Sequence, residues 1–305
     1  MAEGDVTFPL RAISVKPART LLRLAARLLP GTRALVRPVF IIGCGRSGTT
    51  ALGEVLGRHS RLAYLNEPRD IWLYEPRTDV WSARSRVRGG QLRLTSGDVQ
   101  PTAAARIRRA FAAEVRLQRA ERLVEKLPIN AFRVGWLAGM FPDALFVHLI
   151  RHGLEVAASI ARHAERAAWF GVEGYKWRLL AERAGERGEA DLVELCTDDF
   201  RRGLLEWRLS VSTALDDLAE LSAQRQLEVR YEQLVDQPVE VCRRLEAFID
   251  VGHEPAMAAF ARAGLSRCSP PPDPLSLPPD TPRIAGELLA RLGYLPTVRH
   301  VRRHA

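Results

Sequence analysis

Short apolar runs alternate along the chain with longer stretches in which polar and apolar residues mix. The runs at 39–43 (VFIIG) and 144–150 (ALFVHLI) are almost wholly apolar, as expected for strands buried on both faces of a parallel sheet. Shorter runs at 62–65, 124–128 and 226–231 have the length and composition of further strands. The pattern therefore predicts a central sheet built from these segments.

Amphipathic stretches follow the predicted strands. TTALGEVLGRH (49–59) begins directly after a glycine-rich turn, and HGLEVAASIARH (152–163) follows the second strong strand. Further helices are predicted at 103–122, 130–141, 199–222, 238–249 and 284–294. Alternating strands and helices predict an α/β fold of three layers, similar to that of P-loop proteins, with helices on both faces of a parallel sheet.

Two segments interrupt this alternation. Residues 76–102 are rich in Arg, Gly, Ser and Thr and are predicted to form a long loop or insertion. After Ser266 the chain becomes rich in proline, which is typical of an extended tether. We therefore divide the chain into an N-terminal amphipathic helical segment (1–37), an α/β domain (38–265), and a tether with a C-terminal helix packed on that domain (266–305).

Composition narrows the possible partners only partly. The chain has 305 residues, 47% of them hydrophobic, which is enough for a sizeable core. Its formal net charge is +9, from 45 basic and 36 acidic residues. Arginine, the commoner basic residue, can bond two oxygens of a phosphate at once. The total charge alone does not choose between a small anion, an acidic polymer and a membrane surface.

Cysteine usage and hydropathy indicate a cytoplasmic protein. The four cysteines are scattered, with no CxxC pair and no metal-binding spacing with histidine, so neither a disulfide framework nor a metal site is predicted. No apolar run reaches the ~20 residues that span a bilayer. Leucines and arginines in PARTLLRLAARLLPGTRALVRP (17–38) lie on different sides of a helix, which can dock on the core or contact a membrane peripherally.

The segment Gly43 to Thr50 (GCGRSGTT) carries the clearest chemistry. Its glycines let the backbone bend and approach an anion closely, and the helix that follows directs its first N–H groups to the same place. Arginine and hydroxyl side chains add further donors. The residues expected to bind phosphate or sulfate oxygens are Gly45, Arg46, Ser47, Gly48, Thr49 and Thr50.

The spacing GxxxxG is that of a P-loop, but Thr49 stands where nucleoside triphosphatases have a lysine. That lysine reaches the terminal phosphates, so its replacement argues against ATP or GTP hydrolysis. A P-loop kinase or nucleotide hydrolase remains an alternative. A non-catalytic protein that binds an acidic glycan or a membrane is another.

Four blocks in order resemble the sulfotransferases that use 3′-phosphoadenosine 5′-phosphosulfate (PAPS). GRSGTT resembles their 5′-phosphosulfate loop, and FPDALFVHLIRHGLEVAASI (141–160) resembles their 3′-phosphate motif, with Arg151 and Ser159 at its two binding positions. VRYEQLVDQP (229–238) resembles a late strand of the family in which Tyr231 borders the nucleotide. VEKLPIN (124–130) places Lys126 where the family has a basic residue near the transferred group.

The motifs are most similar to those of the bacterial and tyrosylprotein types of sulfotransferase. This resemblance implies an enzyme that moves a sulfuryl group from PAPS to an acceptor hydroxyl by in-line displacement. Glycans, lipids, small alcohols and tyrosines all remain possible acceptors, and no nucleic-acid partner is expected. The implied catalytic residues are Glu67 as the base, with Lys126 and Arg46 stabilising the leaving group. Glu67 could instead only pair with Arg69 or Arg46, and Lys126 could be a surface charge.

Two residues depart from the family pattern, and several aromatic residues fall near the expected acceptor pocket. His152 stands where an acidic residue commonly follows the motif arginine, and Glu155 replaces a frequent basic residue. The aromatic residues expected to shape the pocket are Trp72, Trp81, Trp169, Phe170, Tyr175 and Trp177.

Overall fold

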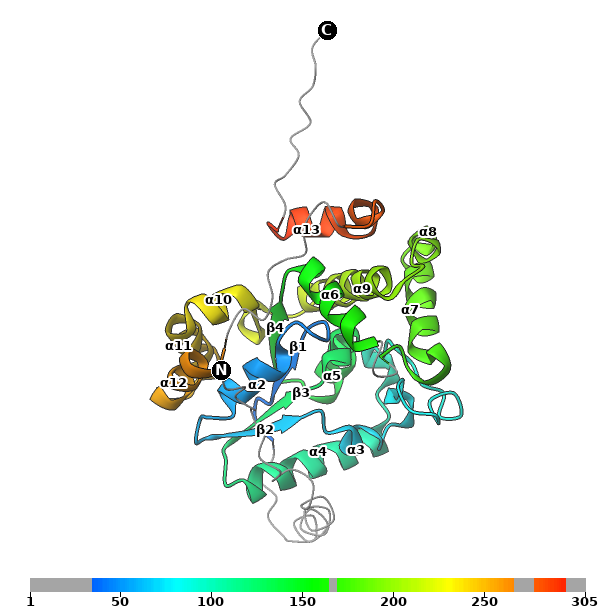
Figure 1. Cartoon of the computed structure of the whole chain (residues 1–305). Helices are drawn as coiled ribbons and strands as arrows, with labels where there is room; N and C mark the ends of the chain where they lie inside the picture. The colour runs from blue at the N-terminus through cyan, green and yellow to red at the C-terminus, as the bar shows by residue number, and fades with distance from the viewer. Residues whose placement is uncertain (1–34, 165–168, 266–276, 295–305) are drawn as a thin grey trace, which may run out of the picture.

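The computed structural model describes residues 35–164, 169–265 and 277–294. Its centre is a five-stranded sheet in the order β2-β3-β1-β4-β5, in which every neighbouring pair is parallel (Figure 1). The strands are β1 (Val39–Ile42), β2 (Leu62–Asn66), β3 (Arg122–Lys126), β4 (Leu145–Ile150) and β5 (Gln226–Arg230). Each corresponds to a predicted run, and the α/β fold class is confirmed.

Helices cover both faces of the sheet, as Figure 1 shows. Those before β4 are α2 (Thr49–Leu56), α3 (Arg69–Trp72), α4 (Pro101–Leu117) and α5 (Val134–Met140). Those between β4 and β5 are α6 (Gly153–Ala164), α7 (Tyr175–Glu186), α8 (Ala190–Glu194) and α9 (Asp199–Ala219). Those after β5 are α10 (Tyr231–Asp236), α11 (Pro238–Ile249), α12 (Pro255–Gly264) and α13 (Glu287–Arg291).

Side chains that alternate along the strands divide the core in two. Phe40 and Ile42 of β1 face a cluster formed with α4, α5, α6 and α9. Val39 and Ile41 face the opposite cluster, formed with α2, α10, α11 and α12. Because both faces are covered, β1 is apolar throughout and β4 is apolar except for His148, which explains why these two strands were recognisable in the sequence.

One predicted helix has a different form. Residues 130–141 are split into a 3₁₀ turn (Pro128–Phe132) and α5, with Arg133 in a non-helical conformation between them (φ −134°). The Arg133 side chain is fully buried and donates hydrogen bonds to the carbonyl oxygens of Leu92, Thr78 and Gln91, at 3.2, 3.0 and 2.7 Å. This break directs the guanidinium towards the preceding segment.

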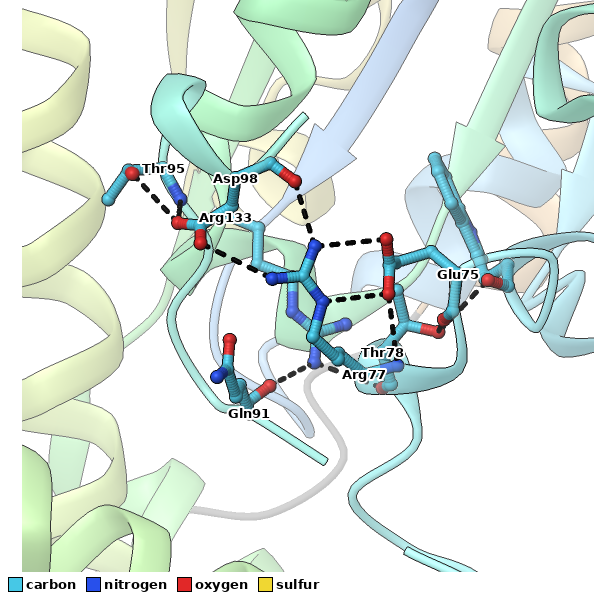
Figure 2. Close-up of polar contacts among 8 residues, drawn as sticks. Glu75, Arg77, Thr78, Gln91, Thr95, Asp98 and Arg133 are labelled. Carbon is cyan, nitrogen blue, oxygen red and sulfur yellow. Dashed lines mark hydrogen bonds and ion pairs between the residues drawn. The ribbon is translucent and has the colours of Figure 1, made fainter. Parts of the chain in front are cut away.

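The segment between α3 and α4 contains the predicted insertion, and side chains fix it in place. It holds two short 3₁₀ turns (Pro76–Thr78 and Ser96–Asp98). Figure 2 shows the Arg77 guanidinium between Glu75 and Asp98, with N–O distances of 2.8 and 3.4 Å, and Arg133 beside them. These contacts give the segment between α3 and α4 a defined position and attach it to the core.

The ends of the chain are only partly described. The amphipathic helix predicted within 1–37 falls almost entirely outside the described residues. Near the C-terminus, a π-helical turn (Pro282–Gly286) and α13 bury Ile284, Leu288 and Leu289 in the cluster that also contains α9. The proposed division into three segments stays a prediction. Within the described ranges, no helix combines the length and the hydrophobicity needed to cross a membrane.

Candidate active site

All five strands end at the same edge of the sheet. Lys126, the last residue of β3, is in register with Asn66 of β2 and Ile41 of β1, and Ile150 of β4 is in register with Arg230 of β5. The segments after the strands therefore emerge side by side. Open parallel sheets bind their ligands at this edge. The catalytic and nucleotide-binding residues predicted for the site come from these segments, except Lys126, which ends β3 itself, and Ser159, which lies two turns into α6.

The phosphate loop after β1 has the conformation that its glycines allow. Gly48 has φ 92°, and a Cβ atom there would lie 2.4 Å from the ring of Tyr231. Arg46 also has positive φ, 71°, which is uncommon for a residue with a side chain. The Ser47 hydroxyl is completely buried and makes no hydrogen bond to any described residue. Such a group fits a site in which an anion oxygen completes the hydrogen bonding.

The first turn of α2 adds backbone donors to the loop. No side chain caps the helix at Gly48, so its first N–H groups remain directed towards the loop. Thr49 is buried and Thr50 is exposed at the start of this helix. Gly45 lies on the other side of the loop, where a Cβ atom would be 2.7 Å from the Trp169 indole. The loop thus has one side towards Tyr231 and another towards Trp169.

The residues of the 3′-phosphate motif lie against this loop. Arg46 Nε donates to Ser159 Oγ at 3.1 Å, and Arg151 Nη1 lies 3.5 Å from the carbonyl oxygen of Arg46. The Arg151 guanidinium lies 4.5 Å above the centre of the Tyr231 ring. The structure therefore brings these four residues together. The Arg46 side chain reaches towards Ser159.

Two residues that sequence reasoning did not assign hold Arg151. Glu155, one turn along α6, accepts hydrogen bonds from Arg151 Nε at 2.9 Å and Nη2 at 2.6 Å. Trp207 of α9 donates its indole N–H to the Arg151 carbonyl oxygen at 3.0 Å. The departure from the family pattern at Glu155 thus has a structural role, because this carboxylate orients the arginine and leaves Nη1 directed at the loop.

Glu67 and Lys126 form an ion pair beside the loop. Lys126 Nζ lies 2.8 Å from one oxygen of Glu67, and Arg69 Nη2 lies 2.7 Å from the other. Lys126 is only 1% exposed, so the interpretation as a surface charge is wrong. Glu67 does pair with Arg69, as the alternative interpretation expected, and it has positive φ, 48°.

The charge state of Glu67 follows from these contacts. Burial raises the pKa of a carboxyl group, because it disfavours the ionised form. The neighbouring cations, Lys126 first and then Arg69, outweigh that effect and hold the pKa of Glu67 below its usual value. Glu67 is therefore ionised at neutral pH and can accept a proton.

A cavity of about 320 Å³ opens between the phosphate loop and Glu67. Apolar and aromatic side chains form most of its wall, including Trp81, Phe132 and Trp169. Lys176 and Glu206 also line it, and no signal in the sequence indicated them. Of the other aromatic residues expected here, Trp72 is fully buried in the core and hydrogen-bonds Glu125.

Two histidines, His148 and His59, lie away from the cavity wall. His148 is buried in β4, and neither ring nitrogen has a partner among the described residues. Burial, reinforced by the charge of Arg230, lowers the pKa of His148 to about 3, so it is neutral. His59 contacts the carbonyl oxygen of Gly252. No group of three or more metal-ligating His, Cys, Asp or Glu side chains occurs in the part of the chain that the structure describes.

Known proteins resemble the chain over most of its length. It is 27% identical over 248 residues to an uncharacterised protein of Aquifex aeolicus, covering 80% of this chain and 29% of that protein. Protein-tyrosine sulfotransferase A of Caenorhabditis elegans is 25% identical over 219 residues, covering 70% of this chain and 50% of that protein. The chain thus spans half or less of the length of these two relatives.

A third relative and a solved structure extend the comparison. Protein-tyrosine sulfotransferase 1 of Danio rerio is 25% identical over 285 residues, covering 85% of this chain and 72% of that protein. The fold is similar to that of a sulfotransferase from Mycobacterium avium, with a TM-score of 0.53 and 16% identity over 90% of this chain and 82% of that one. The model of the sulfotransferase family matches residues 38–255. The chain belongs to the sulfotransferase family, as the ordered motifs predicted, and is an enzyme of that family.

Proposed function

We propose that this enzyme transfers the sulfuryl group of PAPS to an acceptor hydroxyl, with Glu67 as the general base. The observation that carries the proposal is the convergence of two sets of residues at one sheet edge. Arg46, Ser159, Arg151 and Tyr231 form one set, and Glu67 with Lys126 forms the other. The first set suits a nucleotide with two phosphate groups, and the second suits a reacting hydroxyl.

The residues present fit PAPS. The unpartnered Ser47 hydroxyl, the N–H groups at the start of α2 and the Arg46 side chain are donors for a phosphosulfate. Arg151 is oriented by Glu155, and its Nη1 is directed at the carbonyl oxygen of Arg46, the residue whose side chain contacts Ser159, so it can also donate to a 3′-phosphate there. When bound, PAPS supplies a sulfuryl group on a phosphate that leaves readily.

Glu67 and Lys126 have complementary roles in this proposal. The ionised Glu67 accepts the acceptor's hydroxyl proton as the oxygen attacks, and Arg69 holds the carboxylate in place. Lys126, together with Arg46 and the loop N–H groups, stabilises the negative charge that develops on the leaving side. The positive φ of Glu67 is a strained conformation retained beside the reacting groups, which supports a functional role.

Two substitutions test the residue assignments. Glu67→Gln should nearly abolish turnover while leaving the affinity for adenosine 3′,5′-bisphosphate unchanged, because the amide cannot accept the proton. Arg151→Ala should weaken binding of adenosine 3′,5′-bisphosphate far more than binding of AMP, measured by calorimetry. Undiminished turnover would remove Glu67 from the base role, and equal losses for both nucleotides would contradict a 3′-phosphate contact.

A comparison of ligands separates the proposed function from its alternatives. Thermal unfolding of the full chain is followed with adenosine 3′,5′-bisphosphate, with ATP and magnesium, and with heparin. We expect the largest stabilisation with the bisphosphate. A larger shift with ATP and magnesium would favour a kinase or hydrolase, and a shift with heparin alone would favour a binder of acidic polymers.

A further inference from the structure

The indole ring of Trp169 forms part of the cavity wall and lies against the phosphate loop. A Cβ atom on Gly45 would lie 2.7 and 2.8 Å from two carbons of the Trp169 ring, so the indole packs directly on the loop backbone. Trp169 also lines the cavity together with Glu67. A molecule in the cavity therefore meets the ring of Trp169 on one side, close to the groups proposed for sulfuryl transfer.

A buried ion pair fixes this ring. Trp169 Nε1 donates to one oxygen of Glu206 at 2.9 Å, and Lys176 Nζ lies 2.6 Å from the other. The same ammonium lies 4.6 Å from the centre of the indole ring. Lys176 comes from α7 and Glu206 from α9, and both are largely buried. Contacts to both partners of the ion pair hold the ring in one orientation.

The charged groups paired on the cavity wall already have partners of opposite sign. Glu67 is paired with Lys126 and Arg69, and Lys176 is paired with Glu206. A charged acceptor would have to separate one of these pairs, and partly buried pairs are costly to break. Most of the remaining wall within the described ranges is apolar or aromatic, including Ile129 and Phe132. The electrostatics therefore favour an uncharged acceptor.

The size and shape of the cavity further limit which acceptor molecules can bind. About 320 Å³ is near the lower end of the range for small-molecule sites, roughly 300–1,000 Å³. A flat ring stacks well on an indole. A sugar needs several hydrogen-bonding partners, whereas the charged side chains of this wall are bonded to each other and Ser210 Oγ is left as a lining oxygen without a partner among the described residues. A molecule of one or two rings that carries a hydroxyl matches these requirements.

We propose that Trp169, held by the Lys176–Glu206 ion pair, selects the acceptor, and that this acceptor is an uncharged aromatic alcohol of one or two rings. The inference rests on the proposed sulfuryl transfer and specifies its second substrate. Trp169 stacks on the ring of the acceptor and directs the hydroxyl towards Glu67. Lys176 and Glu206 are positioning residues, because they act through Trp169.

Four acceptors test the substrate class with the full chain and PAPS. They are 2-naphthol, the same ring with a carboxylate (6-hydroxy-2-naphthoate), the non-planar alcohol 1-octanol, and the disaccharide cellobiose. Release of adenosine 3′,5′-bisphosphate gives kcat/KM for each. We expect 2-naphthol to exceed the other three by at least about tenfold. Equal or faster turnover of any of the other three would overturn the inference.

Variants test the role of the ring. Trp169→Ala should raise the KM for 2-naphthol by about tenfold or more, while the Kd for adenosine 3′,5′-bisphosphate stays unchanged. Trp169→Phe keeps a ring but loses the bond to Glu206, so its KM should be intermediate. The double variant Lys176→Met, Glu206→Leu removes the ion pair and the acceptor of the indole N–H, so it should resemble Trp169→Phe. Trp177→Phe, which lies outside the cavity wall, is the matched control.

The outcomes separate this inference from the proposed function. An unchanged KM for 2-naphthol in Trp169→Ala would overturn the role of the ring, and Trp169→Phe decides the question if the alanine variant does not fold. Failure of the unaltered chain to use 2-naphthol, while it binds adenosine 3′,5′-bisphosphate, would overturn only the acceptor class. Failure to bind that nucleotide would overturn the proposed function itself.

Discussion

Replacing Gly48 by alanine perturbs the phosphate loop at its most constrained point. Gly48 has φ 92°, a conformation that costs a residue with a side chain roughly 1–2 kcal/mol. The new methyl group would also lie 2.4 Å from Cδ2 and 2.5 Å from Cε2 of Tyr231. Since carbon atoms in contact are about 3.5–4.0 Å apart, the ring must retreat by about 1 Å.

The retreat affects a second contact. Tyr231 is 5% exposed, and Arg151 lies 4.5 Å above its ring, an interaction worth about 0.5–2 kcal/mol. Together the strain and the lost contact amount to about 1.5–4 kcal/mol. If binding requires the original loop, even the smaller value raises the Kd for adenosine 3′,5′-bisphosphate by roughly tenfold.

Calorimetric titration of Gly48→Ala with adenosine 3′,5′-bisphosphate measures this change, and denaturant unfolding shows whether the variant is folded. The matched control is Gly185→Ala in α7, where no atom lies within 4 Å of the added Cβ. That variant should bind normally and gain about 0.5–1 kcal/mol in unfolding free energy from helix propensity. A folded Gly48→Ala protein that binds within about threefold of the original would refute the reasoning.

Three further predictions concern pH and stability. Arg69→Met removes one of the cations that lower the pKa of Glu67. That pKa should therefore rise, and the acid limb of the plot of kcat against pH should move to higher pH. An unmoved acid limb would show that the ionisation of Glu67 does not control kcat. His148 has its pKa lowered to about 3 in the folded chain, so the unfolded chain binds a proton first as the pH falls. The original chain should therefore lose about 2 kcal/mol more than His148→Leu between pH 7 and pH 5 in urea unfolding, and parallel losses would contradict this. Arg133→Met leaves three carbonyl oxygens without their donor and should lower the unfolding free energy by about 3–5 kcal/mol, whereas the exposed-pair control Arg283→Met should change it by less than about 1 kcal/mol.

The sequence was most informative where local composition determines structure. The buried strands β1 and β4 were recognisable because apolar residues face both layers of the core. The phosphate loop was recognisable because its glycines are needed for a backbone turn, as the positive φ of Gly48 shows. Both are properties of a few consecutive residues.

Long-range pairings were beyond sequence reasoning. Glu67 meets Lys126 because β2 and β3 are adjacent and in register, and no local pattern specifies that register. Lys176 and Glu206 lie on different helices, where isolated charges usually indicate a solvated face. The break in the helix predicted at 130–141 depended on Arg133, whose buried hydrogen bonds are made to residues about 40 to 55 positions earlier.

The anchoring of the 73–99 segment by Arg133 separates two parts of the enzyme that can evolve independently. This segment contributes Val80 and Trp81 to the cavity. It contributes no residue to the phosphate loop or to the contacts that join Arg46, Arg151 and Ser159. Substitutions along it can therefore reshape what the cavity admits while the nucleotide site stays intact. A chain built in this way can acquire a new acceptor through changes in one tethered insertion, provided that its attachment to the core is kept.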